Sequence, residues 1–415
     1  MTLTIHEPAR DIPVADQADV LVAGGGPAGI AAALSAARAG ARTTLLERYG
    51  YLGGMITGAY VVAIIGVGDG YGPVAQGFAA ELRERMEKLG AVKPRREPAD
   101  YVVDAELFKW QTVEMLEEAG VRIRLHTWAC APVLDESSMV HRVRGLYAES
   151  KNGREAFLAQ TTIDTTADAD LVAAAGGACE NETHDTTLGI KVEGVDQERV
   201  EAFRRESPAE YEAIVVEAVE MNGGRMPGAN RLLQGVDATD ADSLTRAEIQ
   251  LRREGFSALM HLKEHLPGYE EARVTLTWPQ LGVRLSRRIQ GLYRLRDEDL
   301  SSSRQFEDGI ARLGVYFPDW GPNYKIKGLR YDLPYRCLVP CLARGQAIDG
   351  LLVAGRCISA DPIAGNTMRL IVPCFATGQA AGVAAALAAR HACAPRDVPV
   401  DELRAELRAQ GVYLG

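Results

Sequence analysis

The segment from Asp19 to Glu47 constrains the fold of this chain more than any other. It opens with a short apolar run that predicts a buried strand, continues with three glycines in the spacing GxGxxG, and leads into a helix of small residues. Gly24 permits a tight turn, Gly26 lets backbone approach a pyrophosphate, and Gly29 lets helix and strand pack closely. The free N–H groups and the positive dipole end of the helix would face the same pyrophosphate.

A second apolar run, Thr43–Leu46, completes the pattern and ends at Glu47. This acid stands about 20 residues after the glycines, where a carboxylate can hold ribose hydroxyls. Strand, glycines, helix, second strand and acid fall in register, so the segment predicts a dinucleotide site rather than a flexible glycine loop. On its own, the segment fits NAD as well as FAD.

The rest of the chain alternates helical and strand patterns, which is typical of an α/β fold. Asn152-Gly153 is a strong hairpin signal between two strand-like runs, and the second run feeds a helix through IDTTADAD, residues 163–170. The main predicted elements are helices over 74–89, 104–119, 375–390 and 400–410, with Asp401 as N-cap of the last, and strands over 121–126, 139–148, 155–164 and 351–354.

Between residues 190 and 330 the composition changes. The first part is rich in Glu, Arg and Ala with helical periodicity, broken by MNGGRMPGAN at 221–230. A strand is predicted over 273–278, followed by a helix, or a turn and a helix, over 282–295. We therefore expect an α/β fold in which residues 1–190 and 331–415 form a Rossmann-type domain and residues 191–330 form an inserted α+β substrate region.

Charge and composition limit the partners of this chain. The formal net charge of −10 argues against nucleic acid or an anionic membrane, because both attract basic surfaces. The N-terminus lacks the pattern of a signal peptide, and no run of 18 or more apolar residues appears. Seven scattered cysteines fit reduced thiols, and isolated histidines predict no metal site. We expect a cytoplasmic protein that acts on a small molecule and is free to form a homo-oligomer.

Several motifs together make the chain similar to the FAD-dependent oxidoreductases of the glutathione-reductase superfamily. They are the opening segment, Gly53-Gly54, IDTTADAD, and the C-terminal motifs LLVAGRCIS, GNTMRL and ATGQAAGVAAALA within residues 351–388. RLSRRIQG, residues 284–291, also matches the RxSRRIxG pattern of this family. The resemblance spans most of the chain but is weak between 195 and 270. It implies a GR2-like fold that binds FAD.

Other flavoenzyme classes are disfavoured by missing motifs. A second GxGxxG is absent, so no separate NAD(P)H domain of the pyridine-nucleotide reductase type is expected. Cys337 and Cys341 lack the CxxC spacing of a dithiol redox centre, which argues against a disulfide reductase. The WxWxIP signature of flavin halogenases is also absent.

The resemblance implies a set of FAD-binding residues. The glycine loop would meet the pyrophosphate, Glu47 the adenosine ribose, and the C-terminal motif the ribityl chain and flavin. The full set is Gly24, Gly26, Pro27, Ala28, Gly29, Glu47, Arg48, Gly53, Gly54, Met55, Ala129, Asp168, Arg356, Asp361, Gly365, Asn366, Thr367 and Met368. Where relatives often carry Thr-Gly-Asp, this chain has Thr166-Ala167-Asp168. That change is tolerable if φ at Ala167 is negative.

Catalytic candidates are fewer. Arg369, or the N-terminus of the helix after it, can stabilise negative charge at the flavin N1/O2 edge, and its alternative role is a structural ion pair. Asp361 can equally be a turn residue before Pro362. Tyr335 and Arg336 are candidates for the substrate face, with Tyr60 and His184 as weaker ones.

Arg284, Arg287 and Arg288 would share one face if their segment is helical. They then form either a clamp for an anionic substrate or a charged face paired with the acids at 297–299. The resemblance implies hydride transfer between a small organic, possibly anionic substrate and flavin N5, in an unknown direction. A flavin monooxygenase and a non-catalytic FAD-binding protein are the alternatives.

Overall fold

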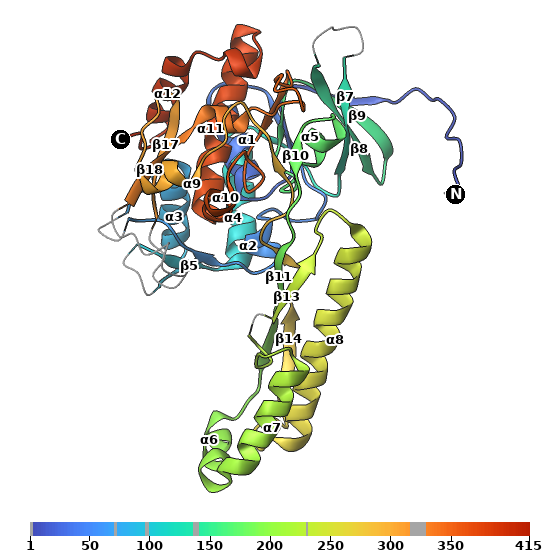
Figure 1. Cartoon of the computed structure of the whole chain (residues 1–415), viewed down its shortest axis with the longest axis vertical. Coiled ribbons are helices and arrows are strands. Elements are labelled where there is room, and N and C mark those ends of the chain that lie inside the picture. Colours follow the sequence, from blue (N-terminus) through green and yellow to red (C-terminus); the bar gives the residue numbers. More distant parts are fainter. Residues whose placement is uncertain (1–2, 70–72, 96–98, 136–140, 230, 316–328) are drawn as a thin grey trace.

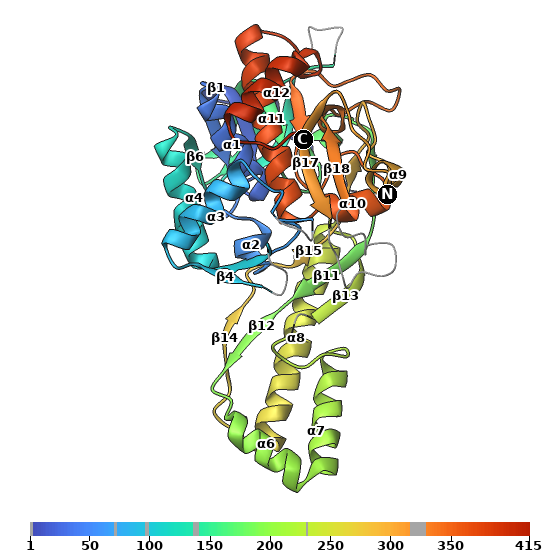
Figure 2. The same ribbon diagram turned by 90° about the vertical axis from the view of Figure 1, so that its left-hand side faces the viewer.

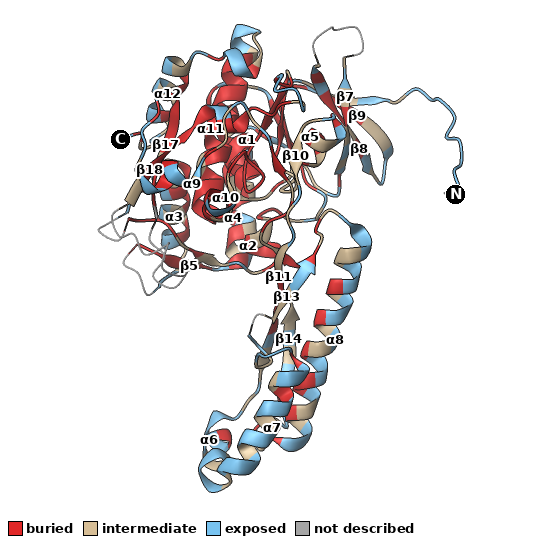
Figure 3. Ribbon diagram, in the orientation of Figure 1, coloured by how far each residue is buried: buried red, intermediate tan, exposed pale blue. Residues whose placement is uncertain are grey.

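A computed structural model describes residues 3–69, 73–95, 99–135, 141–229, 231–315 and 329–415. The predicted strand over 139–148 begins outside these ranges. Figures 1 and 2 show a body that contains both ends of the chain and a narrow arm that projects from it. Burial is concentrated in the body, whereas the arm is largely exposed (Figure 3).

The body is built on a seven-stranded sheet in the order β6-β2-β1-β9-β8-β7, with β19 paired to β9. The strands are β1 (Val14–Ala23), β2 (Thr43–Leu46), β6 (Arg122–Arg124), β7 (Trp128–Leu134), β8 (Val143–Ser150), β9 (Gly153–Asp164) and β19 (Leu351–Val353). β1, β2, β6, β9 and β19 are parallel, and β8 joins β9 as the predicted hairpin. The parallel strands therefore end at one edge, where open α/β sheets bind ligands.

Helices α1 (Pro27–Arg38) and α11 (Ile371–His391) lie side by side in the body (Figures 1 and 2). They come from opposite ends of the chain, so the FAD-binding portions predicted from the two ends are packed together. α11 starts four residues earlier than the predicted 375. By length and composition it could cross a membrane, but 94% of its most apolar 18-residue window is buried inside the structure.

The other helices of the body cover the sheet and its edges. α4 (Ala105–Glu118) matches its prediction, because the Asp104 carboxylate accepts hydrogen bonds from the first free backbone amides. Pro399, not Asp401, is the N-cap of α12 (Val400–Ala409), which corrects the prediction; a proline fits the helix entry. The remaining elements here are α2 (Met55–Gly58), β3 (Ala63–Ile64), α3 (Phe78–Lys88), β4 (Val92–Pro94), β5 (Tyr101–Val103), α5 (Asp170–Ala174) and the 3₁₀ turns Tyr335–Leu338 and Pro395–Asp397.

The arm contains a two-stranded ribbon, part of a three-stranded sheet and three helices. Its elements are β11 (His184–Leu188), β12 (Ile190–Glu193), α6 (Gln197–Glu206), α7 (Pro208–Met221), β13 (Arg231–Val236), α8 (Ala241–His265), β14 (Arg273–Thr277) and β15 (Gly282–Val283). The predicted helical texture and the strand over 273–278 are confirmed, whereas β13 was not expected. β11 pairs with β13 and β15 at the base of the arm.

The predicted helix over 282–295 is wrong. Residues 284–287 form no helix and connect β15 to β16 (Arg288–Ile289), because β15 pairs with β11 and β16 pairs with β10 (Cys179–Glu180). After β16 the chain is back in the body, through α9 (Asp297–Ser301), β17 (Gly309–Val315), β18 (Leu329–Pro334) and α10 (Pro362–Met368). Ile289, Leu295 and Leu313 belong to the core of the body. The arm is therefore shorter than the predicted insertion of 191–330.

Candidate functional site

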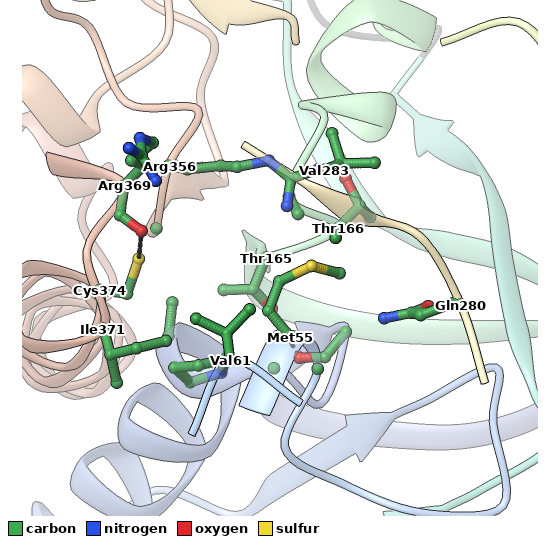
Figure 4. Close-up of a pocket in the computed structure, with 18 of the residues that line it drawn as sticks. Met55, Val61, Thr165, Thr166, Gln280, Val283, Arg356, Arg369, Ile371 and Cys374 are labelled. Atoms are coloured by element: carbon green, nitrogen blue, oxygen red, sulfur yellow. Dashed lines mark hydrogen bonds between the residues drawn. The ribbon is translucent and has the colours of Figure 1, made fainter. Parts of the chain in front are cut away.

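A cavity of about 560 Å³ lies at the ends of the parallel strands (Figure 4). This volume lies within the range of ordinary small-molecule sites, about 300–1,000 Å³. Its wall combines the glycine loop, the C-terminal motif and the base of the arm. Of the predicted residues, those that line it are Gly24, Gly26, Pro27, Ala28, Glu47, Arg48, Gly54, Met55, Tyr60, Ala129, Arg284, Arg356 and Arg369.

The glycine loop has the geometry that its spacing predicts. Gly24 has φ of 113°, and a Cβ there would lie 2.5 Å from the Thr165 carbonyl oxygen. A Cβ at Gly29 would lie 1.8 Å from the Gly24 oxygen, so this residue must be glycine for helix and strand to pack. At Gly26, by contrast, the nearest atom to a Cβ is the Gly54 Cα at 3.8 Å. The loop therefore leaves space at Gly26, and this space fits an approaching pyrophosphate.

Glu47 fastens the same loop. It is buried; its Oε2 accepts from the Gly25 amide at 2.7 Å and its Oε1 from the Tyr49 amide at 2.9 Å. Burial raises the pKa of this carboxyl, and the two amide hydrogen bonds oppose that rise. A carboxylate oxygen can accept more than one hydrogen bond, and Glu47 lines the cavity, so the side chain can both hold the loop and accept from a ribose. Contact with ribose stays a prediction.

Arg48, Trp128 and Ala129 form one end of the cavity wall. The Arg48 guanidinium lies 4.8 Å from the centroid of the Tyr49 ring and 5.3 Å from that of Trp128. Trp128 is 56% exposed, which is unusual for so large an apolar side chain. An exposed indole beside a cation offers a flat surface, and we expect the adenine of the cofactor at this end.

Arg356 brings a buried donor to the cavity. It is 8% exposed, its Nη2 donates to Asp168 at 2.6 Å, and its Nε has no hydrogen-bond partner among the described residues. A buried guanidinium N–H without a partner is costly, and an oxygen of a bound ligand would satisfy it. Asp168 does not line the cavity; it holds Arg356 and accepts from Ser286. These features fit the anionic and hydroxyl-rich part of FAD.

The backbone at Ala167 corrects the expectation of a negative φ. Its φ is 78°, in the left-handed region. The turn is imposed by buried Asp164, whose Oδ1 accepts from the Thr166 amide at 3.0 Å and whose Oδ2 accepts from the Leu171 amide at 2.9 Å. These hydrogen bonds hold a conformation that suits glycine better than alanine.

Ala167→Gly is therefore expected to stabilise the protein by about 1 kcal/mol, because the strain of a left-handed alanine disappears. Thermal unfolding should show a higher midpoint. Ala174→Gly at the exposed end of α5 is the matched control, and it should lower the midpoint because glycine is a poor helix former. A lower midpoint for Ala167→Gly would contradict the assigned backbone conformation.

Arg369 reaches the cavity, together with Leu370, Ile371 and Cys374, but the residues before it do not. Gly365, Asn366, Thr367 and Met368 lie within α10, and none of them lines the cavity. The Asn366 Oδ1 accepts from the Arg369 Nε at 2.5 Å and so orients the guanidinium. The Asp361 carboxylate accepts from the Arg294 Nε at 2.6 Å, away from the cavity wall. Gly53 and Gly29 likewise lie behind the lining residues.

The three predicted arginines do not share a helix face, because their segment forms no helix. Arg284 lines the cavity and lies 3.5 Å from the Asp185 carboxylate; burial lowers its pKa. Arg287 lies 3.5 Å from Asp170, and Arg288 is buried against Glu182. The acids at 297–299 are not their partners: Asp297 accepts from the Ala364 amide and Asp299 pairs with Arg304. A joint clamp of the three is therefore excluded.

Asp170 lines the cavity beside the Arg287 pair. Burial raises its pKa to about 6, with repulsion from Asp164 and Asp168 adding to the rise. This carboxyl therefore changes charge near neutral pH at the cavity wall.

Besides Arg287, three other catalytic candidates do not line the cavity. Tyr335 is buried and donates to the Pro395 carbonyl at 2.8 Å, while Arg336 pairs with Asp308 at 2.9 Å. The Nδ1 of His184 accepts a hydrogen bond from the Asp185 amide. Burial lowers the pKa of this imidazole, and the positive charge of Arg369 lowers it further. Tyr60 does line the cavity and donates to Glu106 at 2.8 Å.

Sequence reasoning missed the lining residues at the base of the arm. Thr187, Trp278, Gln280 and Val283 face the cavity from β11, from β15 and from the segment before β15. The backbone of Gln280 is held in place, because its main-chain N–H donates to the Gly58 carbonyl at 3.0 Å. Trp278, Gln280 and Val283 belong to WPQLGVR, residues 278–284, which carries no motif by itself; only the RLSRRIQG pattern that begins at Arg284 marked this region.

Comparisons with known proteins identify the family of this chain. The family model described as FAD dependent oxidoreductase matches residues 19–407. Digeranylgeranylglycerophospholipid reductase 2 of Methanopyrus kandleri is 32% identical over 148 residues, which cover 35% of this chain and 36% of that relative.

Solved structures with a similar arrangement include a geranylgeranyl bacteriochlorophyll reductase-like protein from Thermoplasma acidophilum. It is 14% identical, with 95% of this chain and 83% of that one covered and a TM-score of 0.42. The p-nitrophenol 4-monooxygenase of Pseudomonas putida is 14% identical, with 95% and 81% covered and a TM-score of 0.41. Because the family model matches nearly the whole chain, from the glycine loop to α12, this protein belongs to the FAD-dependent oxidoreductase family, and its cofactor is FAD.

Proposed function

We propose that this protein transfers a hydride between a small organic substrate and bound FAD. The observation that carries the proposal is the continuity of the cavity, which runs from the glycine loop to a chamber lined by the base of the arm. Bound FAD would supply a two-electron acceptor or donor in that chamber. Substrate and cofactor would then share one enclosed volume, as hydride transfer requires.

The chamber walls are largely apolar and carry a few polar groups. Met55, Val61, Val283 and Ile371 give it apolar sides (Figure 4). Gln280 is 8% exposed and lies across the cavity from Ile371 in the same view. Such a lining, apolar with few convergent polar groups, is typical of small-molecule sites. These residues orient a substrate by contact and by one or two hydrogen bonds.

Positively charged groups line the part of the cavity where negative charge would develop on the flavin during the reaction. Arg369 and the N-terminal residues Leu370 and Ile371 of the α11 region line the same wall. A guanidinium and a helix N-terminus both stabilise an anion, and more strongly in a site shielded from water. Asn366 fixes the guanidinium, so little reorganisation accompanies the reaction.

Arg284→Ala is expected to raise the KM for substrate about tenfold or more with kcat little changed, because Arg284 would bind an anionic group of the substrate. Steady-state kinetics with the substrate found by the screen described next would measure this. Arg287→Ala is the matched control and should change KM less, since Arg287 does not line the cavity. Equal effects of the two substitutions would contradict a role for Arg284 in substrate binding.

The function itself is tested by anaerobic reduction of the FAD-loaded protein. A panel of small organic acids, amines and alcohols is added, and bleaching of the flavin absorbance near its visible maximum is recorded. Bleaching by one compound, with release of its two-electron oxidised product, would support the proposal. NAD(P)H consumption coupled to oxygen insertion would instead indicate a monooxygenase, and bound FAD that no compound reduces would indicate a non-catalytic protein.

A further inference from the structure

The arm carries an apolar stripe that faces solvent. Ile249, Phe256 and Met260 on α8 are 52%, 39% and 49% exposed. Their spacings of seven and four residues place them on one side of the helix. The opposite side carries Leu251 and Leu259, which are buried within the arm. The stripe therefore points away from the core of the arm (Figure 3).

Charged residues extend the same side of α8. Arg246 and Arg253 flank Ile249, and Glu264 follows Met260 by one helical turn. Arg246 lies 4.0 Å from Asp240, and both side chains are highly exposed, so this ion pair is weak. Neither Arg253 nor Glu264 has an ion pair among the described residues. Lys263 stands beside Glu264, but its ammonium donates to the Glu270 and Ala272 carbonyls. The exposed charges of the stripe are therefore positive near one end, at Arg246 and Arg253, and negative at the other, at Glu264.

We propose that this stripe, residues 246–264 of α8, pairs antiparallel with the same stripe of a second copy of the chain. A two-fold axis opposite Gly255 would place Arg246 against Glu264 of the partner, because the two residues stand nine positions on either side of that glycine. In an antiparallel pair, residues equidistant from the axis meet on the same flank.

The apolar residues fit the same register. Ile249 would meet the partner's Met260, and Arg253 would lie over the ring of the partner's Phe256. A parallel pairing would instead set each Arg246 against the other Arg246, and each Glu264 against the other, which like charges disfavour. The arrangement of charge on α8 thus favours a second copy of the chain as the partner, with the two helices antiparallel.

This pairing leaves the cavity free. None of Arg246, Ile249, Arg253, Phe256, Met260 and Glu264 lines it. Two bodies would stand at the outer ends of paired arms, each with its own site. One helix face per protomer is a small interface beside the roughly 800 Å² per partner of a standard one. The dimer should therefore dissociate reversibly on dilution.

Charge reversal tests the pairing. Sedimentation velocity of the full-length, FAD-loaded protein over a range of concentrations should show a monomer–dimer equilibrium. Arg246→Glu and Glu264→Arg, each alone, should weaken the dimer about tenfold or more, since two attractions per dimer become repulsions. The double variant Arg246→Glu/Glu264→Arg should restore it. Arg205→Glu, on exposed α6, should leave the equilibrium unchanged.

Three outcomes would overturn the proposed pairing. A monomer at every concentration would do so, and so would a dimer that neither single reversal weakens. Failure of the double variant to recover association would refute this register. Because every substituted side chain is exposed, the thermal midpoints of the variants should match that of the parent protein and confirm that they are folded.

Discussion

Gly382→Ala is expected to destabilise this protein by about 2 kcal/mol or more, although alanine normally strengthens a helix. In α11 a Cβ at this position would lie 2.1 Å from the carbonyl oxygen of Ala32 in α1. Gly378 meets the oxygen of Ala28 at the same distance. The obstructing atoms are backbone, so the two helices must separate, and the packing between both ends of the chain loosens.

Thermal unfolding of the FAD-free protein measures this effect. The matched control is Gly255→Ala in α8, where a Cβ would meet only side-chain atoms at ordinary distances, Ile190 at 3.6 Å and Asn222 at 3.8 Å. That substitution should raise stability by up to about 1 kcal/mol through helix propensity. A higher midpoint for Gly382→Ala as well would show that α1 and α11 are less closely packed than described.

Gly26→Val should abolish FAD binding and leave the fold intact. Gly26 has φ of −75° and ψ of −175°, a conformation that valine adopts without strain. The space beside it is open, with the nearest atom to a Cβ at 3.8 Å, so the branched side chain fits the empty loop. It would then occupy the space that a pyrophosphate needs. We expect a loss of FAD affinity of about 100-fold or more.

Equilibrium dialysis with FAD and circular dichroism would separate the two effects. The variant should be colourless after desalting, with the spectrum and midpoint of the FAD-free parent. Gly29→Val provides the contrast, since its Cβ would collide with the Gly24 oxygen and disturb the fold itself. Normal FAD affinity in Gly26→Val would mean that the cofactor does not approach this glycine.

The parts of the fold that the sequence predicted are those coded locally. The glycine loop, the Asn152-Gly153 hairpin and the Asp104-capped helix each depend on residues within a few positions. The non-helical segment after Gly282 could not be found in this way. Its strands are set by partners about a hundred residues away, such as Thr186 opposite Val283. Side-chain pattern alone favoured a helix there.

The residues of the candidate site also fall into two groups, those predicted from local sequence and those placed by distant parts of the chain. Gly26 and Glu47 were found because each closely follows a short strand, β1 or β2, and these parallel strands end at the same edge of the sheet. Trp278 and Gln280 were missed, since they reach the cavity only through the pairing at the base of the arm. Ala167 was misjudged because its φ is imposed by hydrogen bonds to Asp164, which no property of alanine reveals.

The contact between α1 and α11 has a consequence for how the protein is made. The glycine loop leaves the ribosome well before the wall opposite it, from Ala354 to Cys374, which lies far later in the sequence. β19 must also insert beside β9 before the sheet is complete. The cofactor cradle can therefore be completed only after α11 has been synthesised. Flavin capture should coincide with the final folding step, and a nascent chain that stops before α11 should hold no FAD.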